Sequence, residues 1–225
     1  MKITLKFLKE LSANNNREWF QQNKAKYEAS QDEMVAFADS LLTEMNKVDV
    51  IATSSGNRSL HRIYRDVRFR KDKTPYKTNR SGFFTRDGAE RRGGYYFHIS
   101  PKETFIMGGF FGPNAEDLLH IRNQISAYSD PLRQVLASDE FKNTFGTLQG
   151  EQLKSSPRGF PKDHEEIDLL RYKQFIVRKD FTKKEVLSKG FHVTMAAGLS
   201  AMLPFFEVMT DYLTTDLNGE PIFGI

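Results

Sequence analysis

Arginine side chains recur at short intervals between residues 62 and 70 of this 225-residue chain, and lysines and tyrosines lie among and after them. A guanidinium donates two parallel hydrogen bonds to a phosphate or carboxylate, so several guanidiniums on one surface would hold a multiply charged oxyanion. Nearby lysines would add point charges, and a tyrosine would add a stacking ring or a hydroxyl. The residues that we expect to bind such an anion are Arg62, Arg65, Arg68, Lys73 and Tyr76.

The stretch 58–92 around these residues is strongly basic. It holds twelve Arg and Lys side chains against four acidic ones, a local charge of +8, whereas the whole chain carries only +4. The rest of the chain therefore sums to −4. A local excess of this size either meets an anion or is neutralised inside the fold. The small net charge permits attraction to polyanions without requiring it.

If residues 62–70 form a strand, alternate side chains share one face. That face carries Arg62, Tyr64, Asp66, Arg68 and Arg70. On this interpretation Asp66 orients the neighbouring guanidiniums and the arginines bind the anion. The alternative interpretation is structural, with Asp66 and Asp72 pairing with the cations beside them in a lattice that fixes a long loop to the sheet.

Two residues are candidates for acid/base catalysis if the anion is a substrate. Asp66 lies within the basic motif, and His98 lies in the aromatic segment 95–100. Either could move a proton while the arginines stabilise charge that develops on a phosphate. For His98 the alternative is a sheet histidine that is hydrogen-bonded to a neighbour. We therefore expect binding of a phosphorylated or other anionic ligand, a small molecule or a nucleic acid, with an enzyme and a stabilising scaffold as the alternatives.

Several classes of site are excluded by composition or lack a motif. The chain has no cysteine, which excludes disulfides, thiolate metal sites and a cysteine nucleophile. Its five histidines show no metal-ligand spacing, and the acidic stretch 163–166 is typical of a capped helix start, so we expect no metal. Neither a dinucleotide-binding nor a phosphate-loop glycine motif occurs, and we expect no cofactor.

The apolar stretches favour a soluble, cytoplasmic protein without membrane association. The first residues lack the apolar run and the cleavage site of a signal peptide. The longest weakly charged stretch, 191–206, is shorter than the about 20 residues that a membrane span needs. The apolar stripe from Phe191 to Leu213 is typical of a core helix. A homodimer interface is its alternative, so the chain is expected to be a monomer or a homodimer.

The order of the expected elements is helices, then strands, then a mixture of both. Helices are predicted at 5–12, 17–47, 113–128, 130–137, 165–172, 183–187 and 191–217, and extended segments at 60–69, 95–100, 104–111, 147–154 and 174–181. This order favours an α+β fold in which a mainly antiparallel sheet is flanked by helices, with long helical segments towards both termini. We expect a single domain over residues 1–225.

The basic motif resembles the hallmark of a widespread bacterial family of conserved hypothetical proteins, a domain of unknown function. That hallmark reads R-x-x-R-D-x-R-F-x-x-x-K-x-x-Y. Its positions are occupied here by Arg62, Arg65, Asp66, Arg68, Phe69, Lys73 and Tyr76. The segments 15–20, 95–100, 157–160 and 169–173 are similar too, so the resemblance covers nearly the whole chain. It implies no established activity, substrate or cofactor.

Overall fold

The computed structural model describes residues 1–69, 71–88 and 91–222. The chain's internal contacts divide it into two compact units. Unit 1 comprises Met1–Thr85, Tyr95–Ile106 and Asp180–Ala197, and unit 2 comprises Arg86–Gly94, Met107–Lys179 and Gly198–Ile225. The single domain expected over residues 1–225 stays a prediction.

A four-stranded antiparallel sheet has the strand order β1-β2-β3-β4, which confirms the predicted α+β class. The strands are β1 Arg80–Thr85, β2 Gly94–Ile99, β3 Thr104–Phe110 and β4 Phe175–Asp180. β2, β3 and β4 lie where aromatic and apolar runs predicted them. β1 was not predicted, because glycine inside a strand weakens the strand signal. Here Gly82 makes room for a ring: a Cβ at this position would lie 2.3 Å from the ring of Phe97.

The N-terminal helices of unit 1 are α1 Lys2–Ala13, α2 Arg17–Gln22, α3 Lys24–Met45 and the single turn α4 Gly56–Ser59. The predicted helix 17–47 is interrupted at Asn23, whose side chain donates to the carbonyl of Trp19 at 2.9 Å. The predicted start of the first helix at residue 5 was wrong, because α1 begins three residues earlier. Thr4 lies inside α1, and its hydroxyl donates to the carbonyl of Ser30 at 3.3 Å.

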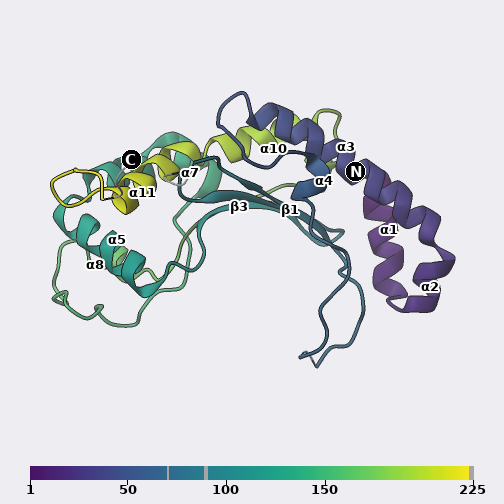
Figure 1. The fold of residues 1–225 in the computed structure, drawn as a ribbon, viewed down its shortest axis with the longest axis horizontal. Coiled ribbons are helices and arrows are strands. Elements are labelled where there is room, and N and C mark those ends of the chain that lie inside the picture. Colours follow the sequence, from purple (N-terminus) through teal and green to yellow (C-terminus); the bar gives the residue numbers. More distant parts are fainter. Residues whose placement is uncertain (70, 89–90, 223–225) are drawn as a thin grey trace. The chain divides into compact units, whose positions relative to one another are not determined.

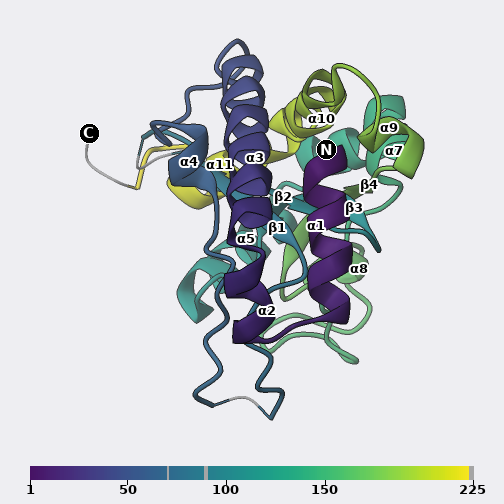
Figure 2. The ribbon, with the colours of Figure 1, turned by 90° about the vertical axis from the view of Figure 1, so that its right-hand side faces the viewer.

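Within unit 1, helices cover one face of the sheet (Figures 1 and 2). Phe37 of α3 meets Phe97 of β2 with ring centroids 6.3 Å apart, and it stacks on Phe191 at 5.6 Å. Phe191 opens α10, Phe191–Ser200, which follows the short helix α9, Lys183–Val186. α1 packs beside α3, as Figure 2 shows. The opposite face of this part of the sheet carries the side chains of the candidate site.

Unit 2 is built mainly from helices. They are α5 Ala115–Ala127, α6 Asp130–Ala137, α7 Asp139–Phe145, α8 Ile167–Leu170 and α11 Leu203–Thr214. α11 packs against α5 and α6, and Pro204 stands in its first turn, where the helix predicted over 191–217 divides into α10 and α11. The predicted strand 147–154 was wrong, because only two isolated bridges form, Gln149 with Ile176 and Gln152 with Tyr172. α7 was not predicted, and α8 is shorter than the helix expected at 165–172.

The C-terminal apolar stretch is longer than the stretch 191–206 that the sequence indicated. Among the described residues, Phe191–Thr214 is long and apolar enough to cross a membrane, and half of its most apolar window is buried inside the protein. The side chains of its stripe are at most 3 % exposed from Phe191 to Leu213. The interpretation of this stripe as core is confirmed.

Candidate anion-binding site

The basic motif lies on an arm, defined here as residues 60–69 and 71–79, that extends from the sheet on the side away from α10 (Figure 1). The arm doubles back on itself through an isolated bridge between Tyr64 and Tyr76. The N–H of Arg65 donates to the carbonyl of Pro75 at 2.9 Å. Pro75 has no N–H to return, so the ladder cannot continue. The extended segment predicted at 60–69 therefore forms only isolated bridges, at Leu60 and Tyr64, and the alternating faces that a strand over 62–70 would have do not form.

Two contacts with the N-terminal helices fix the arm in unit 1. The side-chain amide of Asn15 donates to the carbonyl of Tyr76 at 2.9 Å, and the N–H of Tyr76 donates back to Asn15 Oδ1 at 3.1 Å. Ile63 and Tyr76 insert into an aromatic cluster, where the ring of Tyr76 stacks on Phe20 at 4.0 Å. Burial raises the pKa of Tyr76. Tyr76 therefore holds the root of the arm in place.

A cavity of about 910 Å³ lies between the arm, the end of α1 and the sheet, entirely within unit 1. Its size falls in the range of about 300–1,000 Å³ that small-molecule sites occupy. The arm contributes Arg62, Arg65 and Lys77 to the lining, and the sheet contributes Ser81 and Tyr96. The lining is thus mixed, with cations on the arm facing neutral hydrogen-bonding groups on the sheet.

The two carboxylates of this cavity are already held by arginines. Arg68 Nη2 lies 2.7 Å from Asp66 Oδ2, and Arg68 Nε lies 3.0 Å from Asp66 Oδ1. Arg65 Nη1 lies 2.6 Å from Asp72 Oδ2. The backbone N–H of Thr74, the Arg65 guanidinium and the Thr74 hydroxyl together lower the pKa of Asp72 to about 2. Among the described residues, these two carboxylates therefore form their ion pairs with Arg65 and Arg68.

The ion pairs of the arm are exposed, which limits their effect on stability. The side chains of Arg68 and Asp66 are 76 % and 60 % exposed, and that of Asp72 is 57 % exposed, while Arg65 is partly buried at 20 %. Exposed pairs of this kind typically contribute about 0–1 kcal/mol. A buried lattice of Arg–Asp pairs, which would stabilise the fold strongly, is not what the arm contains.

Two cations of the cavity remain without a counter-ion. In the described part of the chain, the side chains of Arg62 and Lys77 have neither an ion pair nor a hydrogen bond. Burial lowers the pKa of Lys77, and the like charges of Arg80 and Arg62 lower it further. Burial and the charge of Lys77 likewise lower the pKa of His61. This end of the cavity therefore holds uncompensated positive charge.

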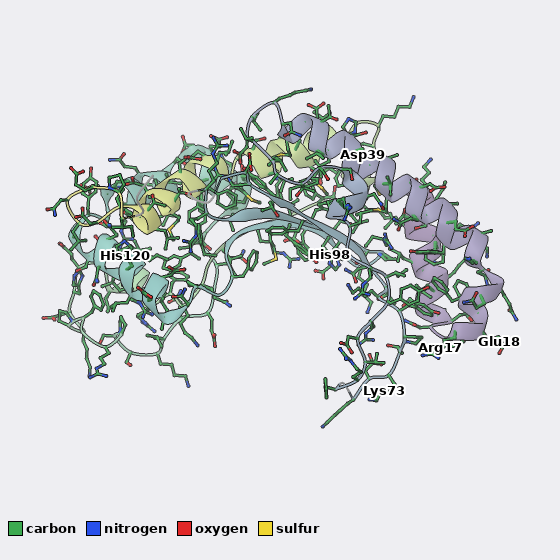
Figure 3. All side chains as sticks on the ribbon, in the orientation of Figure 1. Arg17, Glu18, Asp39, Lys73, His98 and His120 are labelled. Atoms are coloured by element: carbon green, nitrogen blue, oxygen red, sulfur yellow. The ribbon has the colours of Figure 1, made fainter. Side chains whose placement is uncertain are left out.

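The structure brings only part of the expected anion-binding set to the cavity. Arg62, Arg65 and Tyr76 line it, whereas Arg68 and Lys73 are not among its lining residues. Lys73 donates to the carbonyls of Val67 and Arg68 at 2.9 and 3.3 Å, and it lies towards the far end of the arm (Figure 3). Arg70 lies outside the described residues.

The two catalytic candidates have different surroundings. Asp66 lines the cavity in its pair with Arg68. His98, on β2 (Figure 3), stacks on Phe105 at 4.6 Å, and its Nδ1 lies 3.1 Å from Asn79 Nδ2 and 3.3 Å from the Tyr96 hydroxyl. His98 is thus a sheet histidine with polar neighbours on the sheet, and its role as acid or base stays a prediction. His98 is not part of the cavity lining, although Asn79 and Tyr96 are.

Sequence reasoning gave no role to His61, Asn15 or Asn79, and it treated Lys77 only as an adjacent charge. His61 lines the cavity, with its Nδ1 3.0 Å from Ser81 Oγ. A signal for this side of the site was present, because Lys77, Asn79 and Ser81 alternate where the arm runs into β1. Alternate residues of an extended chain share a face.

Unit 2 contains a serine–histidine pair that does not have the geometry of an activated nucleophile. His164 Nε2 lies 2.7 Å from Ser126 Oγ, and its Nδ1 accepts the backbone N–H of Glu166 at 3.0 Å. Because Nδ1 accepts, Nε2 carries the proton of the neutral ring and cannot take one from Ser126. Among the residues with assigned positions, no group of three or more His, Asp or Glu side chains could hold a metal ion.

Comparisons with other proteins agree with the resemblance carried by the motif. The search of curated proteins and the search of solved structures gave no match. The model of the family described as conserved hypothetical protein DUF2461 matches residues 3–207, a span that includes the arm and every residue lining the cavity. The chain therefore belongs to the conserved hypothetical protein family DUF2461.

Proposed function

We propose that the cavity beneath the arm binds a multiply charged oxyanion carried by a phosphorylated or other anionic ligand. One observation carries the proposal: Arg62 and Lys77 line the cavity without a counter-ion among the described residues, while the carboxylates beside them are held by other arginines. Lys77 is partly buried and Arg62 is exposed, and the charge of Arg62 disfavours the charged form of Lys77. A bound anion would offset that repulsion and raise the pKa of Lys77 again.

The neutral groups of the lining suit the same ligand. Ser81 and Asn79 supply a hydroxyl and an amide beside the cations, and Arg65 forms its ion pair with Asp72 through only one nitrogen, Nη1. A guanidinium fork next to a point charge and neutral donors is a common arrangement for phosphate or carboxylate. The positive charge and the hydrogen-bond donors of the lining therefore favour a phosphate or carboxylate ligand.

The two alternatives lack a comparable observation. For an enzyme, Asp66 would have to leave Arg68, and His98 would have to act through Asn79 or Tyr96. For a stabilising scaffold, the ion pairs of the arm would have to be buried, yet Asp66, Arg68 and Asp72 are exposed and only Arg65 is partly buried. Binding is therefore the function that the geometry supports best.

Isothermal titration calorimetry with inorganic pyrophosphate tests the proposal. Arg62→Ala and Lys77→Ala should each weaken binding about 10- to 100-fold, because a hydrogen bond to a charged group contributes about 1.5–3 kcal/mol. Lys102→Ala is the matched control, since it removes an exposed lysine from outside this cavity. Circular dichroism would verify that each variant is folded. An absence of binding by the wild type, or equal binding by all three variants, would overturn the proposal.

A further inference from the structure

Aromatic rings line the same cavity as the unpaired cations. Tyr64 packs against Phe20 and Tyr76, with ring centroids 6.1 and 5.4 Å away, yet 55 % of its surface stays exposed. One part of this ring is therefore supported by the aromatic cluster and another part is open to the cavity. A ring that is already held in place loses little conformational entropy when a planar group stacks on it.

A second pair of rings lines the cavity beside the sheet. His61 and Tyr96 lie 6.2 Å apart, centroid to centroid, at an angle of 32°. Both belong to the lining, together with Arg62 and Lys77. Simple oxyanions such as sulfate or pyrophosphate would use the cations and leave these aromatic surfaces uncovered. The lining matches a ligand that carries both negative charge and a flat aromatic group.

The arm carries a further aromatic ring beside cations, outside the cavity. Phe69 is 95 % exposed, and the guanidinium carbon of Arg68 lies 5.9 Å from the centroid of its ring. Removing an apolar ring from water is favourable, so the exposed ring of Phe69 would be stabilised by a partner that covers it. Lys71 and Lys73 follow it. Phe69 does not line the cavity, so a ligand that reaches it must extend along the arm.

We infer that the ligand is a nucleotide unit within single-stranded nucleic acid, with a phosphate at Arg62 and Lys77, a base on Tyr64 and a further base on Phe69. The inference rests on the proposed function, because both concern the same cations. Stacking platforms set among cations bind single strands, since unpaired bases expose their faces. A duplex would keep its bases stacked inside, away from both rings.

Fluorescence anisotropy with a fluorescein-labelled twelve-residue oligothymidylate tests the inference. Inorganic polyphosphate, thymidine monophosphate and a twelve-base-pair duplex serve as competitors. Unlabelled oligothymidylate should displace the labelled probe better than each of the three competitors, because it alone combines several phosphates with unpaired bases. The slope of log K against log salt should be about −0.7 for each phosphate contacted, and Arg62→Ala should make that slope shallower.

Two aromatic variants separate stacking from charge. Phe69→Ala should weaken oligothymidylate binding about 10-fold, within the range reported for loss of one stacked base, and should leave polyphosphate binding unchanged. Tyr128→Ala is the matched control, because Tyr128 is an exposed aromatic residue (59 %) of unit 2. Tyr64→Leu keeps an apolar side chain against Phe20 while removing the ring. It should weaken binding of thymidine monophosphate and of the oligonucleotide alike.

The outcomes distinguish this inference from the proposed function. If polyphosphate and oligothymidylate bind equally well and Phe69→Ala affects neither, the nucleotide inference is wrong while the anion site stands. If thymidine monophosphate binds as tightly as the oligonucleotide, the inference that the ligand is single-stranded nucleic acid is wrong, and the ligand is a free nucleotide. Tight binding of the duplex would overturn recognition of unpaired bases. If no anion binds, both proposals fail.

Discussion

The side-chain amide of Asn15 forms with Tyr76 the two hydrogen bonds that a neighbouring strand would otherwise form. Asn15 Nδ2 donates to the Tyr76 carbonyl at 2.9 Å, and the Tyr76 N–H donates to Asn15 Oδ1 at 3.1 Å. The arm has few backbone hydrogen bonds of its own, so this amide acts as its missing partner. It connects the end of α1 to the residue whose ring stacks on Phe20.

Replacing Asn15 should therefore loosen the arm and lower stability. Asn15→Ala leaves two polar groups of a buried residue unpaired, and each such group typically costs about 1–3 kcal/mol, less where water reaches it. Asn15→Asp keeps the acceptor and loses the donor, so its effect should be smaller. Urea unfolding measures both.

Asn14→Ala is the control for this experiment, because Asn14 donates only to the carbonyl of Glu10 within its own helix, in an exposed position. We expect its unfolding free energy to match that of the wild type. If Asn15→Ala unfolds at the same urea concentration as Asn14→Ala, the Asn15 amide does not support the arm.

Asp72 should titrate well below an ordinary aspartate. The Thr74 N–H, the Arg65 guanidinium and the Thr74 hydroxyl hold its pKa at about 2, against 3.8 for a free side chain. A depressed pKa means that the carboxylate form is stabilised by folding. Its contribution is complete above pH 3.8 and is lost as the pH falls through about 2. Carbon-13 NMR of the Asp72 carboxyl group measures this directly.

Arg65→Gln separates the causes of that shift. It should raise the pKa of Asp72 only part of the way to 3.8, because the Thr74 N–H, the largest cause, remains. A pKa of Asp72 at 3.8 in the wild type would show that the carboxylate is not held as described.

Local patterns in the sequence were enough to predict much of the fold. The aromatic run of β2, the apolar run of β4 and the proline-led start of α5 each depend on neighbouring residues, so they could be predicted. The arm could not, because its shape depends on Asn15 and Phe20, which lie far from it in sequence. Gly82 likewise concealed β1, since its fit depends on the ring of Phe97.

In the candidate site, too, the features set by neighbouring residues could be predicted and those set by distant residues could not. The arginine motif led to Arg62, Arg65 and Tyr76, all of which line the cavity. Sequence proximity suggested that Asp66 would be shared by the arginines on either side of it. In the folded arm Arg65 instead pairs with Asp72, seven residues away. Such pairings decide which cations have a counter-ion. The lack of one at Lys77 among the described residues could therefore not be predicted.

His61 should report on a bound anion through its own protonation. Burial and the charge of Lys77 hold its pKa below 6.5 in the free protein. Below pH 6.5 the unfolded chain therefore binds a proton at His61 before the folded chain does, and the free energy of unfolding falls as the pH drops from 6.5 to the folded pKa. An anion next to the ring reverses the effect by favouring the imidazolium.

Proton NMR of the His61 ring, with and without sulfate, measures that reversal. Sulfate has no titration of its own near neutrality, so any rise in the pKa of His61 comes from binding. The affinity for sulfate should increase as the pH falls, and His61→Gln should flatten this dependence, whereas His192→Gln should not. An unchanged His61 titration in saturating sulfate would mean that the anion binds elsewhere.

Arg80 should contribute to anion binding through its charge and not through contact. Its side chain lies beneath α3 and is 2 % exposed, and Nη2 donates to Gln31 Oε1. Its Nε and Nη1 have no partner in the described residues, and burial lowers its pKa. A buried charge with unsatisfied donors is unfavourable for folding. Of the two like charges that lower the pKa of Lys77, that of Arg80 nonetheless has the larger effect.

Arg80→Met tests this separation of roles. The methionine keeps much of the apolar stem and removes the unsatisfied charge, so the melting temperature should stay the same or rise. The pKa of Lys77 should rise, and the affinity for pyrophosphate should fall by less than it does in Arg62→Ala, because Arg80 does not line the cavity. Calorimetry and thermal unfolding of the same samples give both quantities. A large loss of stability with unchanged affinity would instead make Arg80 a structural residue, and the positive charge of the cavity would then depend on Arg62 and Lys77 alone.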